Sequence, residues 1–258
     1  MSPTSAGGAA PARLEAVVFD VDGTLVDSER HGHRVAFNLA FEEFGLPYRW
    51  DEEEYGQLLR TTGGRRRIEQ YLARHGVGEA ERADLAAELH DRKTAVMKEL
   101  IAEGRVQARP GATRLLGELA GAGVALAVAT TGSRGWVGNV LEKCAPGVEF
   151  AVTVAGDEVS ARKPDPEAFS RAVELLGVAP ASVVAVEDSA EGLESATGAG
   201  LRCAVVVNAY TADHDLGAAD LVLDGFGEPG RPATVVADRR DTGCTGVLDH
   251  ATLARLLR

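Results

Sequence analysis

Five short, mostly apolar runs recur along the chain, and helical patterns follow them: 15–20, 124–130, 150–155, 182–188 and 202–207. Nearly continuous apolar strands that alternate with helices are typical of a parallel sheet covered by helices on both faces. The pattern therefore predicts an α/β fold with a doubly wound parallel sheet.

Polar residues stand at the ends of four of these five runs. They are Asp20, Thr130, Glu187 with Asp188, and Asn208. In doubly wound sheets, ligands bind beyond the carboxyl ends of the strands. We therefore expect the functional site at this edge of the sheet.

The stretch between the first two runs, residues 30–104, contains no good strand. It carries helical patterns near 33–44, 51–60, 65–75 and 79–103,. This predicts an all-helical cap inserted into a core made of residues 14–29 and 105–258, in which the segment 247–257 forms a terminal helix. Residues 1–13 are rich in small residues and predict a disordered tail,.

Composition narrows the class of partner. The chain has 258 residues, with 27 Lys and Arg against 39 Asp and Glu, a formal net charge of −12. Such a balance argues against nucleic acid or an anionic membrane as the partner. The start of the chain has no apolar region of signal-peptide length, and no segment is apolar enough to span a bilayer. The three cysteines lack metal-ligand spacing, so we expect reduced thiols, which suit the cytoplasm. We also expect a monomer.

The sequence V-F-D-V-D-G-T-L-V-D-S-E, residues 18–29, carries the first candidate chemistry. An aspartate nucleophile can split phosphate ester hydrolysis into two steps, and a second aspartate two positions later can act as general acid and then base. Asp20 and Asp22 suit these two roles. The alternative is a turn followed by a helix cap, because Asp and Gly are common in both.

The motif D-V-D-G-T-L resembles the first motif of the haloacid dehalogenase superfamily of phosphotransferases, and three further motifs of that superfamily follow in order. They are V-A-T at 128–130, R-K-P-D-P at 162–166 and V-E-D-S at 186–189. The resemblance implies that Thr130 and Lys163 bind the transferring phosphoryl group. It also implies that Asp20, the backbone carbonyl of Asp22, Glu187 and Asp188 bind Mg²⁺.

Each later motif also has a structural explanation. Thr130 to Ser133 could be a loop and a helix cap, Lys163 a surface charge, and Asp188 with Glu191 a capping box. The ordered set at successive strand ends favours the functional interpretation. Four carboxylates facing one lysine would also repel a phosphate dianion, which calls for a divalent cation, and oxygen ligands select Mg²⁺.

The presence of Asp22 also discriminates within the superfamily. Members that displace halide lack an acid/base aspartate at this position, so the resemblance implies phosphate chemistry instead. We therefore expect an enzyme that forms an aspartyl phosphate on Asp20.

The predicted cap resembles that of one branch of the superfamily, the CbbY-like proteins, which include phosphatases of xylulose 1,5-bisphosphate. Matching stretches are D-S-E-R-H-G-H-R-V-A-F-N at 27–38, Y-G-Q-L-L-R-T-T-G-G-R-R-R-I at 55–68 and residues 209–220. The branch usually has Lys and Glu where this chain has Arg65 and Arg66. The resemblance implies these substrate-binding candidates: Glu29, His33, Gly63, Gly64, Arg65, Arg67, Lys93 and, in the core, Thr131.

The glycines and arginines at 63–67 could clamp a second phosphate, since backbone N–H groups and guanidinium groups bind oxyanions. The alternative is a solvated basic turn before a helix. Lys93 could likewise be an exposed helical lysine. We interpret both tryptophans, Trp50 and Trp136, as packing residues.

The sequence thus predicts a Mg²⁺-dependent phosphohydrolase of a small sugar phosphate or bisphosphate, most like xylulose-1,5-bisphosphate phosphatase. One alternative is a sugar-phosphate mutase of the β-phosphoglucomutase type, which uses the same core motifs. Another is a catalytically silent regulatory or binding protein, against which the complete set of motif residues argues.

Overall fold

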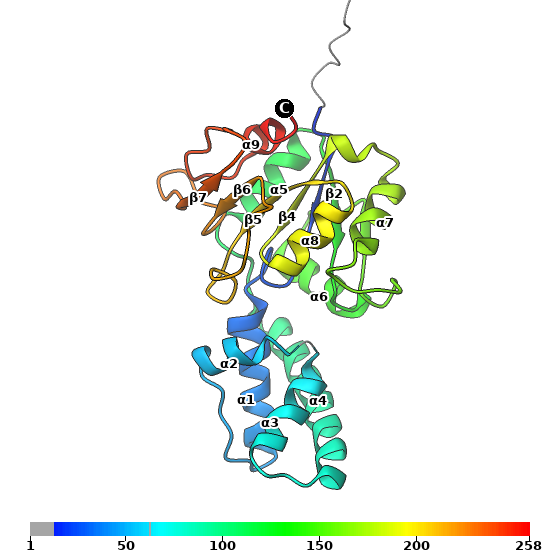
Figure 1. Ribbon diagram of the computed structural model, residues 1–258, viewed down its shortest axis with the longest axis vertical. Coiled ribbons are helices and arrows are strands. Elements are labelled where there is room, and N and C mark those ends of the chain that lie inside the picture. Colours follow the sequence, from blue (N-terminus) through cyan, green and yellow to red (C-terminus); the bar gives the residue numbers. More distant parts are fainter. Residues whose placement is uncertain (1–12, 62) are drawn as a thin grey trace, which may run out of the picture. The chain divides into compact units, whose positions relative to one another are not determined.

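The computed structural model describes residues 13–61 and 63–258, which form two compact units (Figure 1). The first unit runs up to Asp20 and continues with Pro110–Thr131 and Val148–Arg258. The second consists of Val21–Arg109 and Gly132–Gly147. Apart from Arg13, the predicted disordered tail lies outside the described residues.

The first unit is built on a seven-stranded sheet with the order β3-β2-β1-β4-β5-β6-β7, in which only β7 is antiparallel to its neighbour. The strands are β1 (Ala16–Phe19), β2 (Ala125–Ala129), β3 (Val152–Val154), β4 (Val183–Glu187), β5 (Arg202–Val206), β6 (Leu221–Leu223) and β7 (Val235–Asp238). Because β1 and β4 lie in the interior of the sheet, both faces of these strands are buried, which explains why they are apolar throughout except for Glu187 at the end of β4,.

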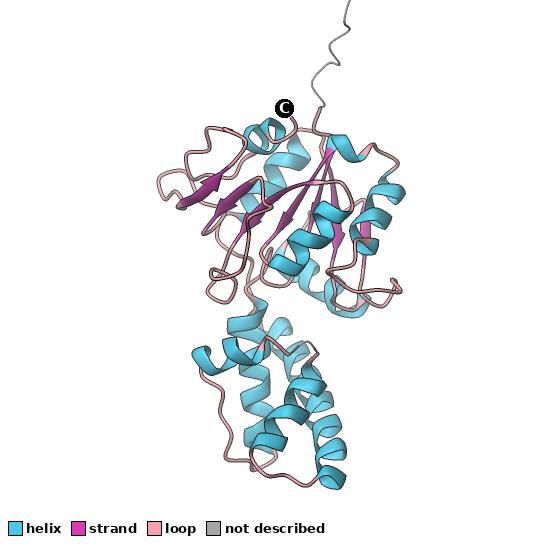
Figure 2. Cartoon of the chain, viewed as in Figure 1, coloured by secondary structure: helices cyan, strands magenta, loops and turns pink. Residues whose placement is uncertain are grey.

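Helices cover both faces of this sheet (Figure 2). They are α5 (Ala112–Gly121), α7 (Glu167–Leu176), α8 (Ala190–Gly198) and α9 (His250–Arg255), with a short 3₁₀ turn at Pro180–Ser182. Ala16 and Val18 of β1 pack in one core with Phe169 of α7 and Leu193 of α8. Side chains of a strand alternate between faces, so the neighbouring β1 residues face the other layer, where α5 contacts β2,. The predicted doubly wound parallel sheet is confirmed.

Two strands at one end of the sheet were not predicted from the pattern. β6 has three residues and β7 lies at the antiparallel edge with Val236 exposed, so neither shows a long apolar run. The terminal helix is shorter than the predicted 247–257. It begins after Asp249, whose carboxylate accepts a hydrogen bond from the Thr252 N–H at 2.7 Å,.

The second unit is helical. It contains a π-helical turn, η1 (Glu29–His33), and the helices α1 (Arg34–Glu43), α2 (Glu52–Leu58), α3 (Gly64–Arg74), α4 (Glu79–Ala102) and α6 (Arg134–Cys144). Its core is aromatic, with Phe37, Phe41, Trp50, Tyr55 and Tyr71 in mutual ring contact,.

Among the described residues of 30–104 there is no strand, as predicted for the inserted cap. The compact unit extends beyond this range, however, because it also includes residues 21–29 and 105–109 and the helix α6. No helix of the described chain is both long and apolar enough to cross a membrane.

Candidate active site

The register of the sheet brings the predicted catalytic residues of the first unit to one edge. Phe19 of β1 is level with Val128 of β2 and with Val186 of β4, so Asp20, Thr130 and Glu187 lie at the ends of three adjacent strands. The Asp20 N–H donates to the Val186 carbonyl at 3.0 Å. This edge is the carboxyl end of parallel strands, where such folds bind ligands.

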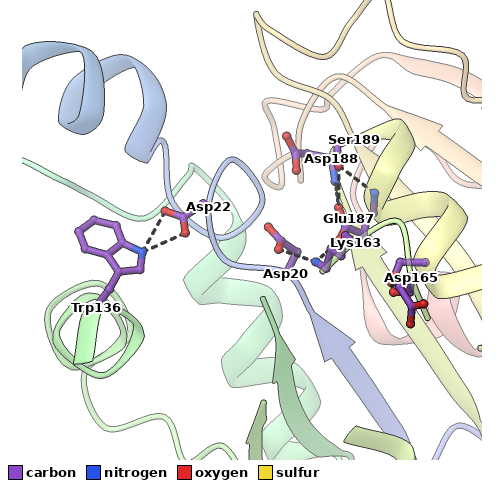
Figure 3. A network of polar contacts seen from close by, with 10 residues as sticks. Asp20, Asp22, Trp136, Lys163, Asp165, Glu187, Asp188 and Ser189 are labelled. Atoms are coloured by element: carbon purple, nitrogen blue, oxygen red, sulfur yellow. Dashed lines mark hydrogen bonds and ion pairs between the residues drawn. The ribbon is translucent and has the colours of Figure 1, made fainter. Parts of the chain in front are cut away.

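Lys163 joins two of these strand ends (Figure 3). It lies in the loop between β3 and α7, and its Nζ donates to Asp20 Oδ1 at 2.7 Å and to Glu187 Oε1 at 2.5 Å. The lysine side chain is only 6% exposed. The interpretation of Lys163 as a surface charge is therefore wrong.

Glu187 is fixed by its surroundings. Its second oxygen, Oε2, accepts from the Asp188 N–H at 3.1 Å and from the Ser189 hydroxyl at 3.4 Å. A Cβ at Gly192, in the first turn of α8, would stand 2.0 Å from the Glu187 carboxylate. Only glycine at position 192 leaves room for this carboxylate.

The pKa values of this group follow from burial and charge. Burial raises the pKa of Asp20 well above its ordinary value, the Lys163 ammonium opposes that rise, and the charges of Glu187 and Asp188 add to it,. Burial would lower the pKa of Lys163, but its two carboxylate partners raise it above the ordinary value, so the ammonium stays charged. The site therefore holds excess negative charge that one lysine does not balance.

Asp188 is oriented by Asn208, the polar residue after β5. The Asn208 amide donates to Asp188 Oδ2 at 2.7 Å. The N-cap of α8 is Ser189, whose hydroxyl accepts from the Gly192 N–H at 3.1 Å. Asp188 is therefore not the cap of this helix, and the capping-box interpretation is wrong.

Thr130 and Thr131 follow β2 at the same edge. Thr130 is buried, and its N–H donates to the Val154 carbonyl at 3.1 Å, whereas Thr131 is exposed. The backbone of Gly156 lies so close that a Cβ there would stand 2.2 Å from the Thr131 carbonyl oxygen. Their predicted roles in phosphoryl and substrate binding stay predictions.

A metal ion fits the acidic group of the first unit. Oxygens of Asp20, Glu187 and Asp188 lie within 4.8 Å of one another, and all three residues are buried. Three carboxylates at this spacing suit a hard divalent cation, which would offset their repulsion. The fourth predicted ligand, the backbone carbonyl of Asp22, belongs to a residue of the second unit and stays a prediction.

In the second unit, Asp22 has three polar neighbours. Trp136 Nε1 lies 2.9 and 3.1 Å from the two carboxylate oxygens (Figure 3), the Ser28 hydroxyl donates to Oδ1 at 2.6 Å, and His33 Nε2 lies 3.8 Å from Oδ1. Burial alone would raise the pKa of Asp22, but interactions with His33, Ser28 and Trp136 outweigh it and hold the pKa below its ordinary value.

Sequence reasoning missed the contact of Trp136 with Asp22. The indole N–H donates to the carboxylate, and its ring lies against His33 with centroids 5.1 Å apart. Gly132 makes room, since a Cβ there would stand 2.6 Å from Trp136 Cδ1. Trp136 is therefore more than a packing residue, whereas Trp50 is fully buried, as predicted.

Lys93 lies beside His33. Its Nζ is 2.8 Å from His33 Nδ1, and the side chain packs over the Phe37 ring at 4.9 Å. Lys93 is 8% exposed, so it is not an exposed helical lysine. A lysine ammonium can only donate, so while Lys93 is charged it leaves the imidazole proton on Nε2, the nitrogen that faces Asp22.

The buried position of Lys93 predicts a pH effect on stability. Burial lowers the pKa of Lys93 to about 8, from an ordinary value of 10.5. Between these pH values the unfolded chain binds the additional proton, so the stability of the folded protein rises with pH in this window. We expect the free energy of unfolding of wild type, relative to Lys93→Met, to increase by up to about 3 kcal/mol from pH 8 to pH 10.5.

Urea unfolding of both proteins across this pH range measures the effect. Lys98→Met, which removes an exposed lysine of the same helix, serves as the control and is expected to follow wild type. Parallel pH curves for wild type and Lys93→Met would show that the buried amine does not titrate in this window.

The remaining cap candidates lie around the start of α3. Gly63 caps this helix with a φ of 89°, a conformation that favours glycine,. Arg65 bonds Glu69 at 3.2 Å and the Ala83 carbonyl at 3.4 Å. Arg67 is 8% exposed and bonds protein groups, including the Tyr55 hydroxyl, which in turn donates to Glu29 at 2.5 Å. Thr62 lies outside the described residues.

The predicted site residues thus fall into two groups. In the first unit, Lys163 links Asp20 to Glu187, and Asp188 lies beside them. In the second unit, His33 lies between Asp22 and Lys93, and Glu29 is connected to Arg67 through Tyr55. Contact with a substrate stays a prediction for all of them.

Comparison with known proteins assigns a family to this geometry. Residues 14–200 match the model of the haloacid dehalogenase-like hydrolases, and residues 160–241 match a second, HAD-hydrolase-like model. Protein CbbY of Cereibacter sphaeroides is 44% identical over 220 residues, which cover 84% of this chain and 94% of that protein.

Solved structures agree. CbbY from Rhodobacter sphaeroides, in a complex with xylulose-(1,5)bisphosphate, matches with a TM-score of 0.70 and 42% identity over 82% of this chain and 94% of that one. A putative β-phosphoglucomutase from Thermotoga maritima matches with a TM-score of 0.66 and 28% identity, over 81% and 93% of the two chains. The chain therefore belongs to the haloacid dehalogenase-like hydrolases and, within them, to the CbbY-like proteins, as its motifs predicted.

Proposed function

We propose that this protein is a Mg²⁺-dependent phosphatase that acts on a small phosphorylated sugar through an aspartyl phosphate. The observation that carries the proposal is the buried group of Asp20, Lys163, Glu187 and Asp188 at the carboxyl edge of the sheet. A nucleophilic carboxylate, a charged lysine and a pair of further carboxylates are the components that an aspartate-based phosphoryl transfer needs.

The reaction has two steps. An Asp20 carboxylate oxygen attacks phosphorus, and the bond from phosphorus to the sugar oxygen breaks. That oxygen takes a proton from the protonated form of Asp22, which is the minor form in the free protein because the pKa of Asp22 lies below its ordinary value,. Water then attacks the phosphorus of the acyl phosphate, and Asp22 takes a proton from the water. The bond from phosphorus to the Asp20 oxygen breaks, inorganic phosphate departs, and Asp20 is again a carboxylate. Lys163, which contacts Asp20 at 2.7 Å, neutralises part of the charge on the phosphoryl oxygens, with Thr130 as a further donor,.

Mg²⁺ is the cation that this oxygen site would take. Asp20, Glu187 and Asp188 would supply its ligands, because oxygens of these three carboxylates lie within 4.8 Å of one another. When bound, Mg²⁺ neutralises charge that would otherwise repel the phosphate. Glu187 then holds Lys163 in position and contributes charge to the metal site.

Xylulose 1,5-bisphosphate is the first substrate to consider. Its support is the 42% identity to a CbbY whose structure contains this sugar bisphosphate. We propose that residues 30–104 form the lid that selects the substrate. Glu29, directly before the lid, faces the sugar together with His33 and Lys93, and the turn at Gly63 and Gly64 faces a second phosphate. This activity suits the cytoplasm, where the three free cysteines would stay reduced,.

A mutase of the β-phosphoglucomutase type remains the second candidate. The match to a putative β-phosphoglucomutase at a TM-score of 0.66 supports the mutase candidate. A mutase would use the same first step but pass the phosphoryl group to a second sugar hydroxyl instead of water.

Phosphate release from a panel of sugar phosphates with Mg²⁺ tests the proposal. The panel contains xylulose 1,5-bisphosphate, ribulose 1,5-bisphosphate and β-glucose 1-phosphate, with analysis of the sugar products. We expect a kcat/KM for xylulose 1,5-bisphosphate at least about tenfold above the others. Formation of glucose 6-phosphate without matching phosphate release would establish the mutase instead, and no turnover of any sugar phosphate would reject both.

A further inference from the structure

Arg67 is a buried arginine whose donors are directed into the protein. Its Nε donates to the Leu58 carbonyl at 3.0 Å, Nη2 to the Thr61 carbonyl at 3.2 Å, and Nη1 to the Tyr55 hydroxyl at 3.3 Å. Only 8% of the residue is exposed. The guanidinium therefore ties the end of α2 and the turn that follows it to the start of α3.

The charge of Arg67 is accommodated by neutral groups. Its guanidinium carbon lies 5.4 Å from the centroid of the Tyr55 ring and 5.9 Å from that of Phe37. Within the described part of the chain, no carboxylate forms an ion pair with Arg67. Two backbone carbonyls, a hydroxyl and two aromatic faces thus offset its burial, and an incoming phosphate would have to displace these bonds.

The Tyr55 hydroxyl connects Arg67 to Glu29 through two hydrogen bonds. It accepts from Arg67 and donates to Glu29 Oε2 at 2.5 Å, a short, charge-assisted bond,. A hydroxyl that accepts from a cation is a better donor, so the two bonds strengthen each other. The chain of contacts from Arg67 through Tyr55 holds the Glu29 carboxylate in one orientation.

We propose that Tyr55 and Arg67 are positioning residues for substrate recognition. Tyr55 orients Glu29 toward the substrate, and Arg67 fixes the Tyr55 hydroxyl and the turn before α3, without binding phosphate itself. This inference rests on the proposed function, in which Glu29 contacts the sugar phosphate. It changes the role of Arg67 from a phosphate clamp to an internal support.

The first test is Tyr55→Phe. This change removes one oxygen and keeps the ring in its contacts with Phe37 and Trp50. Because Glu29 loses the donor that orients it, we expect KM for the best sugar phosphate to rise about fivefold to tenfold while kcat stays within about twofold. Tyr48→Phe makes the same change in the same aromatic cluster, away from Glu29, and is expected to leave both constants unchanged.

Arg67→Lys provides the second test. Lysine keeps the charge but cannot make three bonds in the fork geometry of a guanidinium. We expect a KM increase like that of Tyr55→Phe, and a double variant whose KM rises less than the product of the two single effects, because both act through Glu29. If Arg67→Lys does not fold, Tyr55→Phe decides the question alone.

The outcomes separate this inference from the function on which it rests. An unchanged KM in Tyr55→Phe, or a loss confined to kcat, overturns the positioning role. If wild type still turns over a sugar phosphate, the proposed function stands. No turnover of any sugar phosphate by wild type overturns the proposed function and this inference with it. A KM increase in Arg67→Lys that multiplies fully with that of Tyr55→Phe would assign Arg67 its own contact with the substrate.

Discussion

Replacement of Asp20 with asparagine is expected to lower phosphate release by at least about 10³-fold. The amide has nearly the shape of the carboxylate but does not attack phosphorus, so the aspartyl phosphate cannot form. Asparagine can still accept from Lys163 through its amide oxygen, the contact that Asp20 Oδ1 makes at 2.7 Å. The loss should therefore appear in kcat, measured as phosphate release from the best substrate of the panel.

Asp27→Asn is the matched control. It makes the same chemical change at a partly exposed aspartate that follows the first motif, and Asp27 contacts only His31, at 3.6 Å, among the ion pairs of the described residues. We expect its kcat to stay within about twofold of wild type. If Asp20→Asn retained more than a tenth of wild-type kcat, Asp20 would not be the nucleophile.

The sheet was predictable from sequence where strands are buried on both faces. β1 and β4 have four and five consecutive buried residues and read as apolar runs. β6 has only three residues, and β7, at the edge of the sheet, has no fully buried residue. Short and edge strands are stabilised by their neighbours, and a local apolar pattern does not report that contribution.

The part of the candidate site that lies in the first unit was predictable for a related reason. Asp20 directly follows β1, Glu187 is the last residue of β4 and Asp188 comes next, and parallel strands in register bring their ends together. The contact of Trp136 with Asp22 was not predictable, because Trp136 comes from α6, more than a hundred residues later. Arg67 shows a second limit of prediction from sequence. Its neighbours at Gly63 to Arg66 suggested an exposed clamp, and sequence does not show that three protein groups already occupy its donors.

Replacement of Lys163 with methionine is expected to destabilise the protein strongly when Mg²⁺ is absent. The ammonium lies between Asp20 and Glu187 and is almost fully buried. Its removal leaves three neighbouring carboxylates without a compensating charge, which typically costs about 3–5 kcal/mol. Unfolding in urea with EDTA should show this loss, and phosphate release should fall at least about 10²-fold, because the phosphoryl oxygens lose their cation.

The same variant tests the metal site, because a dication can supply the missing charge. We expect Mg²⁺ to stabilise Lys163→Met more than it stabilises wild type, since in wild type the lysine already offsets part of the repulsion among Asp20, Glu187 and Asp188,. Lys98→Met, at an exposed position, should respond to Mg²⁺ as wild type does. Equal stabilisation of wild type and Lys163→Met by Mg²⁺ would mean that the ion does not bind beside these carboxylates, and the proposed metal site would have to be abandoned.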